Sequence, residues 1–176
     1  MDQPVIDYTE EPEEVLIDLI NIYNGTRFTA GHLFFGMPQI LLGAENPNTS
    51  LVVYAKKFSG YKGQVTIRYQ RLEISTQVSP EESTIFDIGS AVMLSDLIPA
   101  INTQLGVNLN PTDFLDAPLQ FRPGGETNTY QQSLVMLDYS LLYKGTLIMT
   151  IRTNEIALTD VVIKPVLSAF SYTPPT

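Results

Sequence analysis

The chain has 176 residues and a formal net charge of −9; 44% of its residues are hydrophobic, 16% are charged and none is cysteine. The missing cysteines exclude disulfides, thiolate metal sites and cysteine nucleophiles, and they fit assembly in a reducing cytoplasm. The negative charge disfavours nucleic-acid binding through phosphates, and the absence of a long apolar run or a secretory signal disfavours a membrane partner.

The N-terminal part of the chain predicts an acidic arm followed by a helix. Pro12 fits the first turn of a helix, where its missing N–H costs little. Asn24-Gly25 is predicted to end the helix, with Gly25 in the left-handed cap conformation. The residues predicted to form its apolar face are Val15, Leu16, Leu19, Ile20, Ile22 and Tyr23.

A β-hairpin is predicted after an irregular stretch at 26–49. The runs Leu51–Phe58 and Gln64–Ile74 are rich in β-forming residues and flank a connection that contains glycine. The second run changes its apolar alternation after Tyr69, which predicts a β-bulge near Gln70.

The second half of the chain predicts the same order of elements. A strand at Thr84–Ile88 precedes a helix capped by Ser95 or Asp96, with Pro99 in its first turn. Its apolar face is predicted to comprise Leu97, Ile98, Ile101 and Leu105, and Gly106 ends it. After irregular residues 107–132, the strand-like runs Ser133–Leu142 and Thr146–Ile156 predict a second hairpin, followed by a strand at Asp160–Val166 and an extended tail from Tyr172.

The chain contains collinear internal matches that recur after slightly less than half of its length. Leu16-Ile17-x-x-Ile20-Asn21-x-x-x-Gly25 returns as Leu97-Ile98-x-x-Ile101-Asn102-x-x-x-Gly106, and Tyr61-Lys62-Gly63 returns as Tyr143-Lys144-Gly145. We therefore expect an α+β fold of two tandem repeats, at 1–80 and 81–176. Each repeat would hold one helix and an antiparallel hairpin, and the two would pack as a pseudo-symmetric pair.

Candidate catalytic and metal-binding residues are few. His32 is the only histidine, and its glycine-flanked position favours a hydrogen-bonded or surface residue over a general base. Asp113-x-x-Asp116 could offer carboxylates to calcium, but the preceding proline favours a local turn or cap. We expect no enzyme, no cofactor and no metal. Scattered carboxylates leave a glycosidase or other hydrolase as a less favoured reading.

Charge is unevenly distributed along the first half. Residues 1–18 carry seven acids and no base, whereas 56–71 carries bases and no acid. Aromatic residues between these bases are compatible with single-stranded nucleic acid, but a solvated hairpin is favoured. A third reading has the acidic arm of one subunit contacting the basic hairpin of the next, which propagates into rings or lattices. The residues of this predicted contact are Glu10, Glu11, Glu13, Glu14, Lys56, Lys57, Lys62, Arg68 and Arg71.

Two stretches carry a resemblance to known proteins. Asn48–Ala55 with Ser59–Arg71, and Ile101–Asp116, resemble a repeat in uncharacterised virion proteins of large tailed bacteriophages. The resemblance implies a structural component of a virion, assembled in the host cytoplasm, whose partners are other virion proteins or copies of itself in a symmetric assembly. Head decoration, tail, and fibre or baseplate all stay open. The alternative is a carbohydrate-binding adhesin module of a fibre or baseplate, although the missing tryptophan weakens a sugar-binding cleft.

Overall fold

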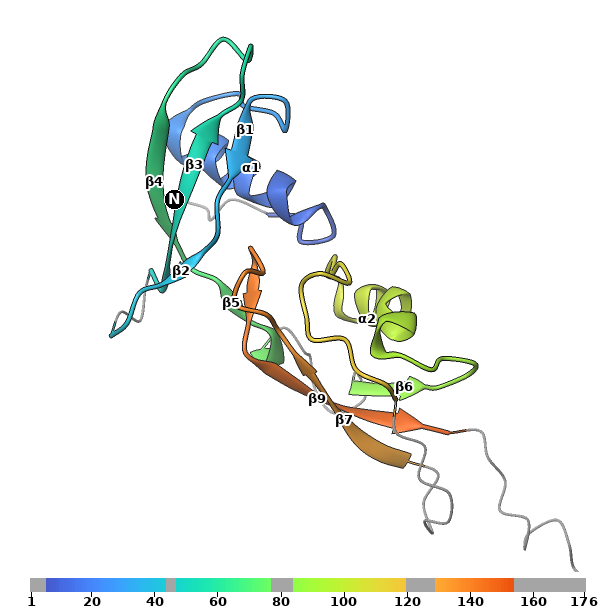
Figure 1. Cartoon of the computed structure of the whole chain (residues 1–176). Helices are drawn as coiled ribbons and strands as arrows, with labels where there is room; N and C mark the ends of the chain where they lie inside the picture. The colour runs from blue at the N-terminus through green and yellow to red at the C-terminus, as the bar shows by residue number, and fades with distance from the viewer. Residues whose placement is uncertain (1–5, 44–46, 77–83, 120–128, 154–176) are drawn as a thin grey trace, which may run out of the picture.

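The computed structural model describes residues 6–43, 47–76, 84–119 and 129–153. Within these residues the fold is α+β, with two α-helices and several small sheets arranged along an elongated molecule (Figure 1). A first half with α1 and β1–β4 lies at one end, and a second half with α2, β6, β7 and β9 lies at the other. Buried side chains from both halves form one hydrophobic core cluster.

Helix α1 (Pro12–Asn24) has the predicted bounds. Pro12 lies in its first turn, and Gly25 follows it with φ of 63°, as the left-handed cap requires. Its buried side chains come from the first half of the helix and include Val15, Leu16 and Ile17. The predicted apolar face is wrong at its C-terminal end, where Ile22 and Tyr23 are exposed because the helix packs mainly through its first two turns.

The first half contains a four-stranded antiparallel sheet. Strand β3 (Thr49–Ala55) pairs with β4 (Gln64–Tyr69) on one side, with Val53 opposite Val65. Its other side pairs with β1 (Leu33–Phe35) and then β2 (Gln39–Ile40). The predicted hairpin is confirmed, while the stretch expected to be irregular contains these two short strands. No strand in the described ranges pairs with the outer edge of β4.

The second half places β9 (Thr146–Arg152) between two strands. It runs antiparallel to β7 (Thr129–Val135) and parallel to β6 (Ile85–Asp87). The second hairpin is therefore present, but its first strand was predicted at Ser133–Leu142 and lies earlier in the chain, partly within the stretch expected to be irregular. The predicted strand before the second helix is thus confirmed.

The second helix begins later than the predicted caps. A 3-10 helix, η3 (Leu94–Leu97), leads into α2 (Ile98–Leu105), which holds Pro99 in its first turn and ends at Gly106 with φ of 64°. Leu97 is therefore the residue before α2. The Asp96 carboxylate instead accepts hydrogen bonds from the backbone N–H groups of Val92 and Met93, and these bonds lower its pKa.

The predicted β-bulge near Gln70 is wrong because the chain changes sheets there. Strand β4 ends at Tyr69, and β5 (Leu72–Glu73) then pairs in parallel with β8 (Tyr143–Lys144) before a short 3-10 helix, η1 (Ile74–Thr76). The change in apolar phase marks this transfer between the two halves.

Two further points concern the limits of the described chain. None of its helices is long and apolar enough to cross a bilayer. The strand predicted at Asp160–Val166 and the extended tail lie outside the described residues.

Candidate functional site

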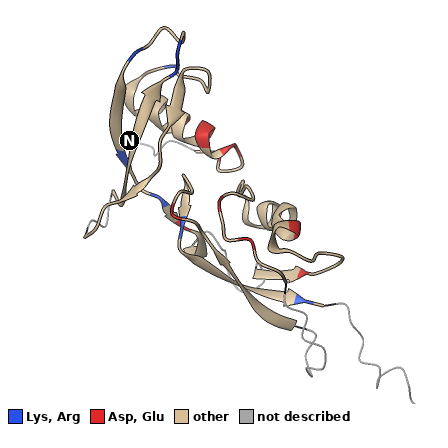
Figure 2. Cartoon of the chain, viewed as in Figure 1, with Lys and Arg blue, Asp and Glu red and all other residues tan. Residues whose placement is uncertain are grey.

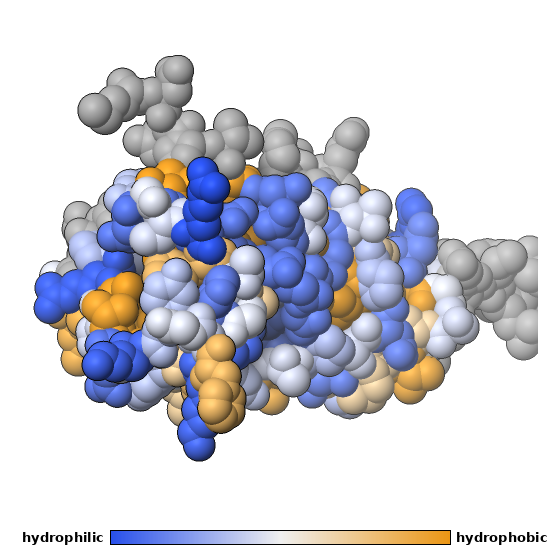
Figure 3. Space-filling model, turned by 90° about the horizontal axis from the view of Figure 1, so that it is seen from above, coloured by the Kyte–Doolittle hydropathy of each residue, from blue (hydrophilic) through white to orange (hydrophobic). Residues whose placement is uncertain are grey.

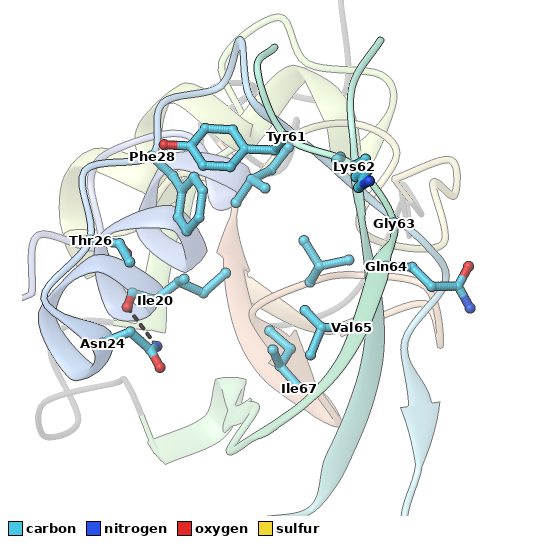
Figure 4. Close-up of a pocket in the computed structure, with 13 residues that line it drawn as sticks. Ile20, Asn24, Thr26, Phe28, Tyr61, Lys62, Gly63, Gln64, Val65 and Ile67 are labelled. Carbon is cyan, nitrogen blue, oxygen red and sulfur yellow. Dashed lines mark hydrogen bonds between the residues drawn. The ribbon is translucent and has the colours of Figure 1, made fainter. Parts of the chain in front are cut away.

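An apolar groove runs between α1 and β4. Two neighbouring hollows of about 350 and 660 Å³ make up this groove, and Ile20, Asn24 and Ile67 line both of them. We call the smaller one the upper hollow and the larger one the lower hollow. Figure 4 shows the upper hollow, with Ile20 on the helix side and Val65 and Ile67 on the strand side.

The groove exists because α1 covers only part of the sheet. Val65 is 59% exposed and Ile67 is half-buried, although both point toward the groove. Ile20, in the second half of α1, is also only partly buried. Hydrophobic side chains are visible at the surface between polar ones when the molecule is seen from above (Figure 3).

An aromatic cluster stands at the upper end of the groove. The ring of Tyr61 lies edge-on to Phe28 at 5.0 Å and to His32 at 5.4 Å between ring centroids. Tyr61 is 53% exposed, so its ring is open to solvent. The Nδ1 atom of His32 accepts a hydrogen bond from the backbone N–H of Thr29 at 2.9 Å, as expected for a hydrogen-bonded loop histidine.

The predicted basic residues lie mostly on the hairpin, whereas the predicted acidic residues lie before and within the first turn of α1 (Figure 2). Lys57, Lys62 and Arg68 are exposed, and Lys56 donates to the carbonyl of Ala30 at 2.7 Å. The ion pairs found in the described part of the chain do not involve these four cations.

The acidic residues are accessible as a group. Glu13 and Glu14 are exposed on α1 and Glu10 is half-buried. The exposed Glu11 accepts a hydrogen bond from the side chain of Asn110 in the second half at 3.1 Å. The structure thus leaves the two charged sets separate within one chain.

Arg71 does not belong to the predicted contact surface, because it is only 1% exposed. Its guanidinium donates to the carbonyls of Asp138 at 2.8 Å and Ser140 at 3.1 Å, and its Nε donates to the Thr49 hydroxyl. The side chain of Asn48 hydrogen-bonds both the backbone N–H and the carbonyl of Arg71. Arg71 is therefore a buried link between the two halves.

Asp113 and Asp116 have separate hydrogen-bond partners. Asp113 is buried and accepts from the backbone N–H of Asn110 at 2.8 Å, and burial raises the pKa of this carboxyl. Asp116 accepts from the backbone N–H and the hydroxyl of Ser95. These bonds are the cap and turn roles that the sequence favoured. Within the described ranges, no group of three or more potential metal ligands occurs.

The groove was not predicted from the sequence. The alternation of Val65, Ile67 and Tyr69 predicts a strand with one apolar face, but it does not predict whether a helix covers that face.

Comparison with known proteins identifies a family. A model described as a family of unknown function, DUF7941, matches residues 6–176. No curated protein and no solved structure matches the chain.

Proposed function

The chain belongs to DUF7941, a family of unknown function, and we propose that it is a structural protein of a tailed-phage virion that acts through protein–protein contacts. It would serve as a head decoration, tail, or fibre or baseplate component. The observation that carries the proposal is the open apolar groove between α1 and β4. Large exposed apolar surfaces on a soluble domain mark sites of interaction.

The first half also exposes apolar side chains that do not line the groove. Phe58 and Leu42 are almost fully solvent-accessible, and Met37 is 65% exposed. Burial of such side chains in an interface is favourable by about 1.5 to 3 kcal/mol each. Assembly with other subunits would therefore be favoured by the free energy gained when these side chains are removed from water.

The charge distribution supports a directional contact between subunits. The exposed hairpin cations Lys57, Lys62 and Arg68 and the exposed acids Glu13 and Glu14 are complementary but separate within one chain. A contact between one subunit's acids and the next subunit's hairpin would pair them, and it would favour correct orientation more than affinity.

We also propose that the fold is a tandem duplication with pseudo-symmetric halves. The helix ends support this: the Asn21 side chain accepts from the N–H of Phe28 and donates to its carbonyl. Asn102, which matches Asn21 in the sequence repeat, makes the same two bonds to Leu109.

The loops and strands repeat in the same way. The backbone N–H of Thr29 donates to the side chain of His32, and that of Asn110 donates to the side chain of Asp113 at the corresponding place in the second half. The pair Leu33 and Ala55 recurs as the isolated bridge between Phe114 and Met136. The match of Ser50-Leu51-Val52 to Ser133-Leu134-Val135 has a slightly larger residue shift than the one that relates Leu33 to Phe114 and Ala55 to Met136.

Quantitative peptide mass spectrometry of gradient-purified particles from the source system tests the virion role. We expect this chain in the particles at a copy number that fits a capsid or tail symmetry. Its absence from particles, combined with abundance in the cells that produce them, would refute the proposal.

The aromatic cluster supports the alternative, a carbohydrate-binding adhesin module. Tyr61, packed against Phe28 beside the groove, offers an exposed ring on which a sugar could stack. Glycan-array binding tests this alternative. Binding should be lost in Y61A but kept in Y139A, because Tyr139 is similarly exposed in the second half. Equal loss in both variants, or no binding by the wild type, would reject it.

A further inference from the structure

The outer edge of β4 is unpaired at a place where the corresponding edge in the second half carries a strand. When Tyr61-Lys62-Gly63 is aligned with Tyr143-Lys144-Gly145, β4 corresponds to β9, and the last residues of β9, Thr150–Arg152, pair with the parallel strand β6 at the positions that match 68–70. In β6, Phe86 lies opposite Ile151 and Asp87 lies opposite Arg152. Within the described ranges, no strand takes the place of β6 beside β4.

The same contrast appears in the buried faces of the two strands. Leu147 and Met149 of β9 are 3% and 0% exposed, whereas the corresponding Val65 and Ile67 border the open groove. Ile101 of α2 is fully buried, while the corresponding Ile20 of α1 is not. Among the described residues, the apolar side chains of the first half therefore leave this place open, whereas those of the second half fill it.

The backbone of β4 is oriented to receive a strand. The N–H of Ala55 donates to the carbonyl of Gly63, so alternate residues of β4 from Gly63 onward face β3. The backbone groups of Gln64, Thr66 and Arg68 then face the open edge. The corresponding edge of β9 is occupied, since the N–H of Ile88 donates to the carbonyl of Arg152.

We propose that this edge and groove accept an added β-strand from residues 154–176 of a second copy of the chain, an inference that rests on the proposed assembly function. Strand addition would satisfy the edge groups and place alternate apolar side chains in the groove. A groove-binding tail is a head-to-tail contact, which continues into rings or filaments.

The sequence of the segment fits this role. Almost half of the residues in 154–176 are hydrophobic, and Val161-Val162-Ile163 is a run of β-branched residues. The alternative segment, 1–5, reads Met-Asp-Gln-Pro-Val and offers little apolar surface. Ile6 and Tyr8, which follow this segment, line the lower hollow. They do not line the upper hollow.

The direction of the chain favours a neighbouring copy. Strand β9 begins next to β8 at the junction of the halves and runs away from the first half (Figure 1). A segment as long as 154–176 spans at most roughly 75 Å when extended. It can therefore leave one molecule at the end of β9 and reach the groove of the next.

Cross-linking tests the identity of the occupant directly. Because the chain has no cysteine, single-cysteine variants T66C and V162C can be mixed and treated with a short bismaleimide. We expect a covalent mixed dimer, with far less product from the matched mixture of I148C and V162C, since Ile148 is exposed on β9. Equal yields would overturn the proposal. So would a T66C/V162C double variant that cross-links within one chain only.

Sedimentation velocity tests the groove with the full chain. V65K should weaken self-association by about tenfold or more, because it places a charge where the added strand would bury the valine side chain. I148K should leave association unchanged, and circular dichroism should show both variants folded, since both positions are exposed. Association that is insensitive to V65K, or a monomeric wild type at all concentrations, would overturn the strand-addition proposal. Particle mass spectrometry would still decide the virion role separately.

Discussion

At the scale of single residues, a histidine and an aspartate serve the same purpose in the two halves. His32 and Asp113 each accept a hydrogen bond from the backbone N–H three residues earlier. Such local bonds fix a turn because they satisfy a donor that the turn leaves without a backbone partner. The acceptor is a ring nitrogen in His32 and a carboxylate oxygen in Asp113, but the same backbone donor is satisfied.

This equivalence predicts the effect of exchanging the residue. H32A should lower the free energy of unfolding by about 1 kcal/mol, because it removes the acceptor for Thr29. H32D should lose less than H32A, because a carboxylate can accept the same bond, as in the second half. Urea denaturation measures both values. A larger loss in H32D than in H32A would contradict the shared role.

Asp113 and Asp87 should give opposite pH dependences. Burial raises the folded-state pKa of Asp113 above its unfolded value, so the folded state binds the proton more tightly. The stability of the wild type relative to D113N should therefore rise as the pH falls from 7 to 4. Hydrogen bonds from Arg152 lower the pKa of Asp87, so the stability of the wild type relative to D87N should fall over the acidic range in which Asp87 becomes protonated. Urea titrations at several pH values measure both, and the same sign for both would contradict these environments.

At the scale of elements, the two hairpins close on corresponding glycines with different surroundings. Gly63 and Gly145 have φ of 91° and 84°, which disfavours any side chain. A Cβ atom on Gly63 would meet nothing nearby, whereas one on Gly145 would collide with the carboxylate of Glu73. That carboxylate pairs with Lys144, so the collision would also disturb the contact between β5 and β8.

We therefore predict unequal costs for the same substitution. G63A should lower the free energy of unfolding by about 1 kcal/mol from backbone strain alone. G145A should lower it further, and part of the extra loss should disappear in the E73A background. Denaturant midpoints of the wild type, G63A, G145A, E73A and the E73A/G145A double variant check this. Equal losses in G63A and G145A would show that Glu73 moves aside at no cost.

The helices and hairpins were predictable because their determinants are local. Pro12, Gly25 and Gly106 stand at helix ends for reasons that operate within a few residues. The transfer of the chain from β4 to β5 was not predictable, because the pairing of β5 with β8 depends on residues of the other half. A change in apolar phase is compatible with a bulge or with a change of sheet, and sequence does not separate the two.

The candidate site was predictable only in part. The charged residues were identified, but Arg71 was assigned to the surface because an arginine is usually solvated. Its burial depends on hydrogen bonds to the carbonyls of Asp138 and Ser140. These residues are far from Arg71 in the sequence, so local sequence patterns do not predict the contact. The groove was missed for a related reason, since it is defined by what α1 leaves uncovered.

At the scale of the whole molecule, hydrogen bonds and strand pairing around Arg71 join the two halves in addition to the shared core. Arg71 donates to carbonyls of the second half, and the hydroxyl of Tyr69 donates to the carbonyl of Leu141 at 2.6 Å. Beside them, β5 and β8 form a parallel pair. The assembly proposed above would use the C-terminal segment of one half and the groove of the other, so it depends on how firmly the two halves are joined.

Replacement of Arg71 tests that rigidity. Hydrogen bonds from a buried guanidinium to carbonyls are charge-assisted, and their removal leaves the buried carbonyl of Ser140 and the partly buried carbonyl of Asp138 without this donor. R71M should therefore lower the free energy of unfolding by about 3 kcal/mol or more, whereas R68M, at an exposed position on β4, should change it by less than about 0.5 kcal/mol. If Arg71 joins the halves into one cooperative unit, amide hydrogen exchange in R71M should accelerate first in β5 and β8. Similar unfolding energies and exchange rates for R71M and R68M would mean that the core cluster, and not this arginine, couples the two halves.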